Sequence, residues 1–185
     1  MSKLKNRNLN KYFLNLSNKL SEINQFVTFP NPCVGAALLN KNNISTSYTG
    51  IDGSPHAEYK LLKGGKKIHN SNLYTSLEPC CHKGKNPSCV DIILKKKIKH
   101  VYTNSEDFDY RVRGKTKILF NKKNVKIFYK NDASSSSKIH NISSKAKIPY
   151  VVSKIALSGD GFSKHNKKKL FTGRHALKFA HLQRY

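Results

Sequence analysis

The amino-acid sequence predicts an α/β domain in three layers, with helices on both faces of a central sheet. Two observations predict this class. Amphipathic helical segments alternate with short β-rich runs along most of the chain, and 185 residues are enough to bury a core between such layers. The individual elements follow from the spacing of apolar residues and from the residues that end helices and strands.

The first half of the chain begins with an amphipathic helix. Apolar residues recur there at helical spacing: Leu9, Tyr12, Phe13, Leu16, Leu20 and Ile23. Residues 34–39 form a near-continuous apolar run that predicts a buried strand, and residues 44–49 pair back after a polar turn. A second helix is predicted over 56–64, where helix-forming residues end at two glycines, and a short β-rich run follows at 73–77.

The second half continues the alternation. Residues 87–97 are predicted to form a helix whose inward side chains are Val90, Ile93 and Leu94. Short strands are predicted at 100–103 and 125–129, separated by a segment that ends with the apolar residues 118–120. The four serines at 134–137 and the polar run through Lys147 indicate a junction between two parts of the chain.

A hydrolytic zinc site is predicted by four residues, His56, Glu58, Cys80 and Cys89. The histidine and the two thiols supply three ligands and leave the fourth tetrahedral position for water, whose pKa zinc lowers to about 7. Glu58 stands two residues after His56 and can take the proton from that water and pass it to a departing amine. With a proline directly before the first thiol, this arrangement is typical of zinc-dependent nucleobase deaminases.

The chain has four cysteines, and a disulfide framework is not expected because no secretory segment is present. Cys80 follows Pro79 at or near a predicted helix start, where the helix dipole lowers the pKa of a thiol. Cys81 would point to another face of that helix, and Cys33 lies in a proline-rich loop as a small apolar residue. The competing interpretation, ordinary buried cysteines and a surface histidine, is disfavoured by the joint spacing.

Three segments resemble the deaminase half of the bifunctional riboflavin-biosynthesis deaminase/reductase. They are residues 29–35 (FPNPCVG), 56–58 (HAE) and 76–89 (SLEPCCHKGKNPSC). The long spacing between the thiols is specific to this branch of the family. The resemblance implies a three-layer α/β/α cytidine-deaminase-like domain with a mixed sheet and one Zn2+ per chain. It also implies deamination of a phosphorylated diaminopyrimidinone with release of ammonia.

The resemblance further implies contacts to the substrate. Asn31 would hold the pyrimidine, and its competing role is that of a turn former between two prolines. His82 and Lys85 match positions near the phosphate-bearing sugar, although Lys85 could equally be one more exposed lysine. Asp107 and Asp109 match a loop that also contacts the substrate.

That loop, residues 107–115, departs from the family pattern, which reads Asp-Pro-Asn-Pro and ends Gly-Arg-Gly. Asp107 and Gly114 match, both prolines are replaced, Asp109 stands in place of asparagine, and Lys115 stands in place of arginine. Thr49 occupies a position where the family often has histidine. The zinc chemistry is expected to survive these changes, and the recognition of the sugar is expected to differ.

The charge of the chain is strongly positive. Lysine and arginine total 35 against 10 acidic residues, a formal net charge of +25, but only five of the cations are arginine. We expect nonspecific binding to nucleic acid only, because specific recognition of phosphates and bases more often uses arginine. No membrane partner is expected, because the longest apolar run, residues 34–39, has six residues against the about 20 that a span needs. The free thiols and metal ligands favour the cytoplasm.

Two domains are expected. Residues 1–147 would form the zinc-dependent deaminase, and residues 148–185 would be the truncated start of a reductase-like domain, because 149–161 and, more weakly, 171–174 resemble its opening motifs. With so short a remnant, NADPH binding is not expected, and a separate reductase chain becomes a candidate partner. The oligomeric state stays open. Three alternatives remain: a deaminase of another base or nucleoside, a basic nucleic-acid-binding protein without turnover, and a decayed copy that folds without turnover.

Overall fold

The computed structural model describes residues 2–64, 68–84 and 87–148, and then 151, 153, 155–163, 173–175 and 178. The chain divides into two compact units, Met1–Lys147 and Ile148–Tyr185. The first unit contains all the helices and strands discussed below. The assignment of the two domains, including the reductase-like start at residue 148, stays a prediction.

Five strands form one mixed sheet in the order β2-β1-β3-β4-β5. Pairing is antiparallel from β2 to β1 and from β1 to β3, and parallel from β3 to β4 and from β4 to β5. The elements along the chain are α1 (Ser2–Leu20), β1 (Gly35–Asn40), β2 (Asn43–Tyr48), a 3-10 turn (Ile51–Gly53), α2 (Ala57–Leu62), β3 (Asn72–Thr75), α3 (Cys89–Lys95), β4 (His100–Thr103), α4 (Lys115–Asn121), β5 (Lys126–Tyr129) and α5 (Ser135–Ala146).

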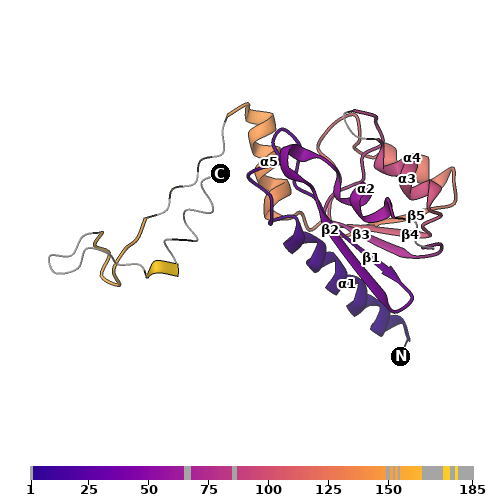
Figure 1. Ribbon diagram of the computed structural model, residues 1–185, viewed down its shortest axis with the longest axis horizontal. Helices are drawn as coiled ribbons and strands as arrows, with labels where there is room; N and C mark the ends of the chain where they lie inside the picture. Colours follow the sequence, from indigo (N-terminus) through magenta and orange to yellow (C-terminus); the bar gives the residue numbers. More distant parts are fainter. Residues whose placement is uncertain are drawn as a thin grey trace. The chain divides into compact units, whose positions relative to one another are not determined.

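Helices cover both faces of this sheet, because alternate residues of its central strands point to opposite sides. Leu38, Leu73 and Val101 belong to the larger core cluster, together with side chains of α2, α3 and α4. Their neighbours Ala37 and Tyr74 belong to a second cluster with side chains of α1. Figure 1 shows α1 on one side of the sheet and α2, α3 and α4 on the other. The predicted three-layer α/β fold with a mixed sheet is therefore confirmed.

The apolar stripe predicted for the first helix is only partly correct. Phe13 is buried and stacks on Tyr74 of β3 with ring centroids 4.9 Å apart, and Leu14 beside it is also buried. Tyr12 is 61% exposed, and Ile23, which lies beyond the end of α1, is 54% exposed. Helical spacing identified a set of apolar residues, but the position of the sheet decides which of them become buried.

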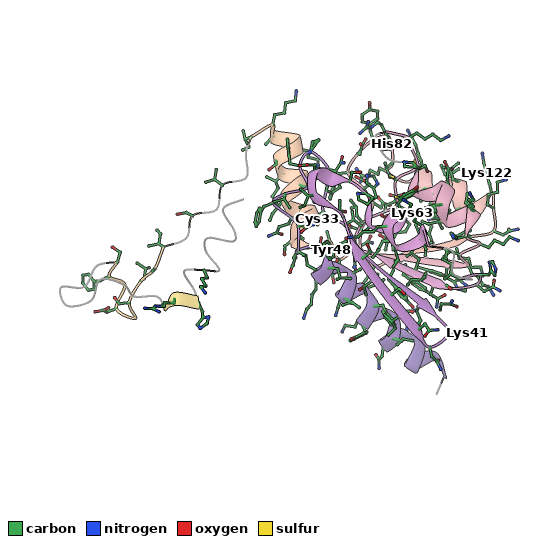
Figure 2. All side chains as sticks on the ribbon, in the orientation of Figure 1. Cys33, Lys41, Tyr48, Lys63, His82 and Lys122 are labelled. Atoms are coloured by element: carbon green, nitrogen blue, oxygen red, sulfur yellow. The ribbon has the colours of Figure 1, made fainter. Side chains whose placement is uncertain are left out.

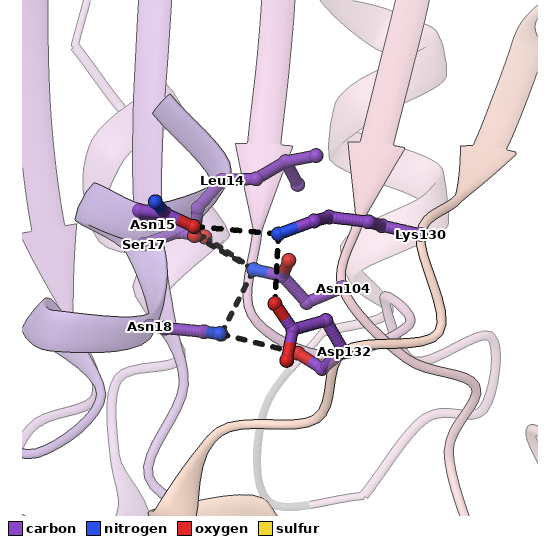
Figure 3. Close-up of polar contacts among 7 residues, drawn as sticks. All are labelled: Leu14, Asn15, Ser17, Asn18, Asn104, Lys130 and Asp132. Carbon is purple, nitrogen blue, oxygen red and sulfur yellow. Dashed lines mark hydrogen bonds and ion pairs between the residues drawn. The ribbon is translucent and has the colours of Figure 1, made fainter. Parts of the chain in front are cut away.

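A buried asparagine holds α1 against the end of β4 (Figure 3). Asn104 has no exposed surface, and its Nδ2 donates to the Leu14 carbonyl at 2.7 Å, to Asn18 Oδ1 at 2.8 Å and to Ser17 Oγ at 3.2 Å. All three acceptors lie in the second half of α1. This single amide therefore joins three polar groups of α1 to the end of β4, beside the Ser17 hydroxyl, which also donates to the Leu14 carbonyl at 2.8 Å.

We expect Asn104→Leu to lower the free energy of unfolding by about 1–3 kcal/mol, because it removes the buried hydrogen bonds that join α1 to the end of β4. Lys130→Met is the control from the same network, since it removes the exposed ion pair between Lys130 and Asp132 (2.7 Å). Such surface pairs contribute about 0–1 kcal/mol. Urea denaturation of both variants measures the difference, and equal losses would contradict the assigned role of Asn104.

The segment predicted as a junction, 134–147, is a helix in the structure, and the boundary between the two units follows it directly, after Lys147. α5 is capped by Ser134, whose Oγ accepts a hydrogen bond from the Ser137 amide at 3.1 Å. Ser136 and Ser137 are buried, and Ser136 donates to the Cys33 carbonyl at 3.3 Å. Serine runs suggest linkers by composition, yet a serine is also a favoured helix cap, and here the capping role prevails.

The positive charge is spread over separate elements of the first unit. Lys41 lies at the turn between β1 and β2, Lys63 follows α2 and Lys122 follows α4, and all three side chains are exposed (Figure 2). This distribution is what solvated lysines on several faces produce. Within the described residues, no helix combines the length and the apolar character that crossing a membrane requires.

Candidate metal centre and active site

Three side chains from separate elements meet at one point, as a metal site requires. His56 is the residue before α2, Cys80 lies in the loop after β3, and Cys89 is the first residue of α3. The Nδ1 atom of His56 lies 3.4 Å from the sulfur of each cysteine, and all three ligand atoms lie within 4.8 Å of one another. The structure thus brings together the three residues that the sequence nominated as ligands.

This donor set fits zinc. Zinc in a tetrahedral site binds an imidazole nitrogen at about 2.0–2.1 Å and a thiolate sulfur at about 2.3 Å, which separates nitrogen from sulfur by about 3.6 Å. The observed separations of 3.4 Å between His56 Nδ1 and the two sulfurs are close to that value. Three protein ligands, rather than four, are typical of catalytic zinc sites.

The expectation that Cys80 lies at a helix start is wrong. No helix follows Pro79 directly, and α3 begins only at Cys89. The thiol still gains from that helix, because the Cys89 amide donates to Cys80 Sγ at 3.4 Å. Hydrogen bonding from Cys89, followed by that from His56, lowers the pKa of Cys80, and the same hydrogen bond between the two thiols raises the pKa of Cys89. The sulfur is therefore held as the thiolate that a metal needs.

Glu58 lies in the first turn of α2, beside the donors but outside the set of ligands. Its side chain is only 2% exposed, and it lines the same cleft as His56 and Cys80. Burial first, and then the charge of Cys80, raises the pKa of Glu58 to about 7. A neighbouring divalent cation acts in the opposite direction, because it favours the carboxylate. A carboxyl group balanced in this way can accept a proton and return it near neutral pH.

The candidate site opens into a cleft of about 710 Å³. Its lining includes seven of the nine residues that the sequence nominated: Asn31, His56, Glu58, Cys80, His82, Asp107 and Asp109. Cys89 completes the metal-binding group behind them. Lys85 lies outside the described residues, so its predicted contact with the phosphate-bearing sugar stays a prediction.

Two polar side chains of this lining have hydrogen-bonding capacity for a ligand. Asn31 Nδ2 donates to the Gly53 carbonyl at 3.2 Å, which fixes the amide and uses one of its two N–H donors. His82 Nδ1 is buried and has no partner among the described residues. Buried polar atoms are normally paired, so an unpaired one in a cleft suggests that a bound molecule supplies its partner.

Gly53 makes room for Asn31. Its φ is +73°, and a Cβ at this position would lie 2.5 Å from Asn31 Nδ2 and 2.8 Å from the Thr28 carbonyl oxygen. Gly53→Ala is therefore expected to displace the Asn31 amide and to raise KM for the substrate. Gly64→Ala is the matched control, because nothing lies within 4 Å of the added methyl group. Steady-state kinetics measure both, and an unchanged KM in Gly53→Ala would show that the placement of Asn31 is not critical.

A buried carboxylate organises the segment after β4. Glu78 is 2% exposed, and its Oε2 accepts hydrogen bonds from the amides of Asp107 (3.2 Å) and Gly114 (3.3 Å). Its Oε1 accepts from the Tyr129 hydroxyl at 3.0 Å. Glu78 stands just before Pro79 in the motif and was not singled out from the sequence. In the structure it connects the metal-binding loop to the segment 106–114 that borders the cleft.

Several residues of the cleft were missed by sequence reasoning. The exposed lining residues Phe108, Tyr110, Arg111 and Lys145, together called the rim below, border the outer part of the cleft. His140 and Asn141 of α5 line it as well. The α5 residues were missed because the serine run and the polar residues that follow it were interpreted as a junction.

Comparison with known proteins agrees with this geometry. Residues 7–105 match the family model described as the cytidine and deoxycytidylate deaminase zinc-binding region. The chain therefore belongs to the cytidine and deoxycytidylate deaminase family, whose zinc-binding region it contains. The predictions of a deaminase fold, of a zinc cofactor and of a deaminase enzyme are confirmed by this match and by the clustered donors.

Similar proteins place the chain within one branch of that family. It is 35% identical to the diaminohydroxyphosphoribosylamino-pyrimidine deaminase of Buchnera aphidicola over 119 aligned residues. The alignment covers 63% of this chain and 81% of that protein. It is 30% identical over 158 residues to the riboflavin biosynthesis protein RibD of Bacillus amyloliquefaciens, covering 83% of this chain but only 43% of that protein.

Solved structures show the same fold. A diaminohydroxyphosphoribosylaminopyrimidine deaminase/5-amino-6-(5-phosphoribosylamino)uracil reductase from Thermotoga maritima superposes with a TM-score of 0.75 at 24% identity, covering 94% of this chain and 53% of that one. RibD from Acinetobacter baumannii gives a TM-score of 0.74 at 24% identity, covering 92% of this chain and 50% of that one. The chain thus spans about half the length of these two proteins.

Proposed function

We propose that this chain converts 2,5-diamino-6-(5-phosphoribosylamino)pyrimidin-4-one to 5-amino-6-(5-phosphoribosylamino)uracil and ammonia. The observation that carries the proposal is the buried carboxylate of Glu58 beside the donors His56, Cys80 and Cys89, in a cleft large enough for a nucleotide-sized ligand. The similarity to deaminases with this named activity supports the choice of substrate.

The reaction replaces an exocyclic amino group with oxygen. Bound zinc supplies a Lewis acid that acidifies a water molecule. Glu58 accepts a proton as the oxygen of water bonds to the ring carbon, and it returns the proton to the amino group as the carbon–nitrogen bond breaks. Water and the diaminopyrimidinone are consumed, and the uracil and ammonia are formed, so atoms and charges balance. Because Glu58 is buried, its proton is exchanged with the reactants rather than with bulk solvent.

The other lining residues orient the substrate. The fixed amide of Asn31 offers its second N–H donor and its oxygen to the edge of the pyrimidine. His82 Nδ1 offers a buried partner to the sugar side. In this proposal the ring therefore lies between Asn31 and Glu58. The ribose and its phosphate extend toward the exposed rim.

The proposal also includes the cellular compartment and the partners of the chain. We place the chain in the reducing cytoplasm, because its four cysteines are free thiols. A separate reductase chain and residues 148–185 as the start of a reductase-like domain remain predictions. Titration of the pure chain with NADPH tests the expected lack of cofactor binding: saturable binding with turnover would contradict it, and binding only after a second polypeptide is added would support a separate reductase chain.

The test is ammonia release by the zinc-loaded chain from the phosphorylated diaminopyrimidinone. Deoxycytidine monophosphate, cytidine and guanine serve as comparison substrates. We expect kcat/KM for the diaminopyrimidinone to exceed that for each comparison substrate by at least about 100-fold, the discrimination that a few lost polar contacts produce. Comparable turnover of deoxycytidine monophosphate would replace the proposed substrate with another base. No turnover of any substrate by zinc-loaded protein would favour a decayed copy.

A further inference from the structure

The rim of the cleft carries an arginine that is held by a neighbouring carboxylate. Arg111 Nε donates to both oxygens of Asp109 at 3.0 and 2.9 Å, and its Nη2 donates to Oδ2 at 2.5 Å. The Arg111 amide also donates to Asp109 Oδ1 at 2.9 Å, and the Asp109 amide donates to Asp107 Oδ1 at 2.9 Å. The backbone and both side chains are thus fixed together over five residues.

This ion pair cannot matter much for stability. The side chains of Arg111 and Asp109 are 54% and 27% exposed, and exposed pairs typically contribute little to the free energy of unfolding. Its effect is geometric, because a long and flexible side chain is held in one orientation before a ligand arrives. Pre-ordering of this kind lowers the entropy that binding would otherwise cost.

Arg111 keeps donors for a ligand. A guanidinium has five N–H donors, and Asp109 uses the one on Nε and one on Nη2. Among the described residues, Asp109 is the only acceptor that its guanidinium contacts. Three N–H groups therefore remain, arranged in the planar fork that matches two oxygens of a phosphate group.

A second cation reaches the same rim from α5. Lys145 Nζ lies 5.4 Å from the centroid of the Phe108 ring, a cation–π distance, and both residues line the cleft with Arg111. Asn141, four residues earlier on the same face of α5, lines the cleft too. Lys145 is thus held beside the segment that carries Arg111.

The charges at this rim favour an anion. Arg111 and Lys145 contribute two positive charges against one negative charge from Asp109, so the three together leave one net positive charge. The whole chain adds a formal net charge of +25, which attracts anions over longer distances. The inner part of the cleft differs, because its lining includes the buried carboxyl groups of Glu58 and Glu78 and the half-buried Asp107.

We propose that Arg111 and Lys145 bind the phosphate of the substrate at the rim of the cleft, and that Asp109 is a positioning residue that holds Arg111. Identification of the anion as the 5-phosphate rests on the proposed function, whereas the binding of a sugar phosphate monoester does not. This assignment gives Asp109 a role different from the direct substrate contact that the sequence resemblance implied.

The first test is kinetic and uses the zinc-loaded chain with the phosphorylated substrate and its dephosphorylated analogue. Arg111→Gln is expected to raise KM for the phosphorylated compound by about 10- to 100-fold, as the loss of charge-assisted hydrogen bonds predicts, and to leave KM for the analogue unchanged. Lys145→Gln should act in the same direction with a smaller effect. Arg113→Gln is the matched control, since Arg113 pairs with Glu106 at 3.5 Å on the same segment and does not line the cleft.

A double-mutant cycle separates positioning from contact. If Asp109 acts through Arg111, Asp109→Asn raises KM for the phosphorylated compound only, and adding it to Arg111→Gln has no further effect. If Asp109 contacts the sugar itself, Asp109→Asn raises KM for both compounds, and the effect persists without Arg111. The second pattern would overturn the positioning role of Asp109. Equal KM increases for both compounds in Arg111→Gln would overturn the phosphate site.

A binding measurement keeps the inference testable if the proposed substrate is not turned over. Ribose 5-phosphate is titrated into the wild-type chain, Arg111→Gln and Arg113→Gln and monitored by NMR, with ribose as the uncharged comparison. We expect the wild type and Arg113→Gln to bind ribose 5-phosphate more tightly than ribose, and Arg111→Gln to lose this preference. Absence of the preference in the wild type, or its survival in Arg111→Gln, would refute the site whatever the activity proves to be.

Discussion

Glu58→Gln is expected to retain zinc and to lose almost all deamination, with kcat lower by about 10²- to 10⁴-fold, the range that a positioned acid–base group contributes. Glutamine has the shape of glutamate but cannot carry a proton between water and a departing amine. Glu58 lies outside the group of metal donors, so the metal should stay bound. Ammonia release under saturating substrate and elemental analysis of the same sample give the two quantities.

The control for this variant is Glu22→Gln, which removes an exposed carboxylate that does not line the cleft. It should leave kcat unchanged. Thermal melts establish that both variants fold. If Glu58→Gln turned over at near the wild-type rate, Glu58 would not be the acid–base group, and the proton would have to be carried by another residue of the cleft.

The metal site was predictable from the sequence because its chemistry tolerates few substitutions. A histidine, two thiols and a carboxylate two residues from the histidine have no common structural reason to occur at this spacing. The supporting helices were predictable in outline, because helix-forming residues and apolar residues at helical spacing mark them, although the position of the sheet decides which of these apolar residues become buried. The error at Cys80 shows where this reasoning stops. Pro79 suggested that a helix starts at Cys80. The amide that donates to the Cys80 sulfur belongs instead to Cys89, the first residue of α3.

The rim of the cleft was not predictable in the same way. Arg111 and Lys145 lie about 34 residues apart in the sequence, on a loop segment and on a helix of mainly polar composition. The family pattern marked the loop 107–115 but did not single out Arg111, and in a chain with 35 lysines and arginines no local pattern distinguishes Lys145 from the other cations. Only tertiary structure brings α5 to the segment that follows β4. Residues that bind ligands from loops depend on contacts of this kind, which single-sequence patterns do not encode.

The second large effect is expected on the binding of zinc. Cys89→Ala should abolish zinc binding and lower the thermal stability, because Cys89 is fully buried at the start of α3 and supplies one of the three donors. Metal bound only to the folded state stabilises it, by about 4 kcal/mol when free zinc is 1,000 times its dissociation constant. The wild type should therefore melt at a lower temperature after chelation, whereas Cys89→Ala should not respond to chelator or to added zinc.

Cys81→Ala is the matched control for that variant, because it removes a thiol next to the site but not a donor. Cys81 lies outside the metal-binding group, and its sulfur donates instead to the Arg111 carbonyl at 3.4 Å. The variant should keep one zinc per chain and the wild-type response to chelation. Stoichiometric zinc in Cys89→Ala together with its loss in Cys81→Ala would reverse the assignment of the ligands. Because both cysteines lie near Cys80, the comparison separates membership of the donor set from mere proximity to it.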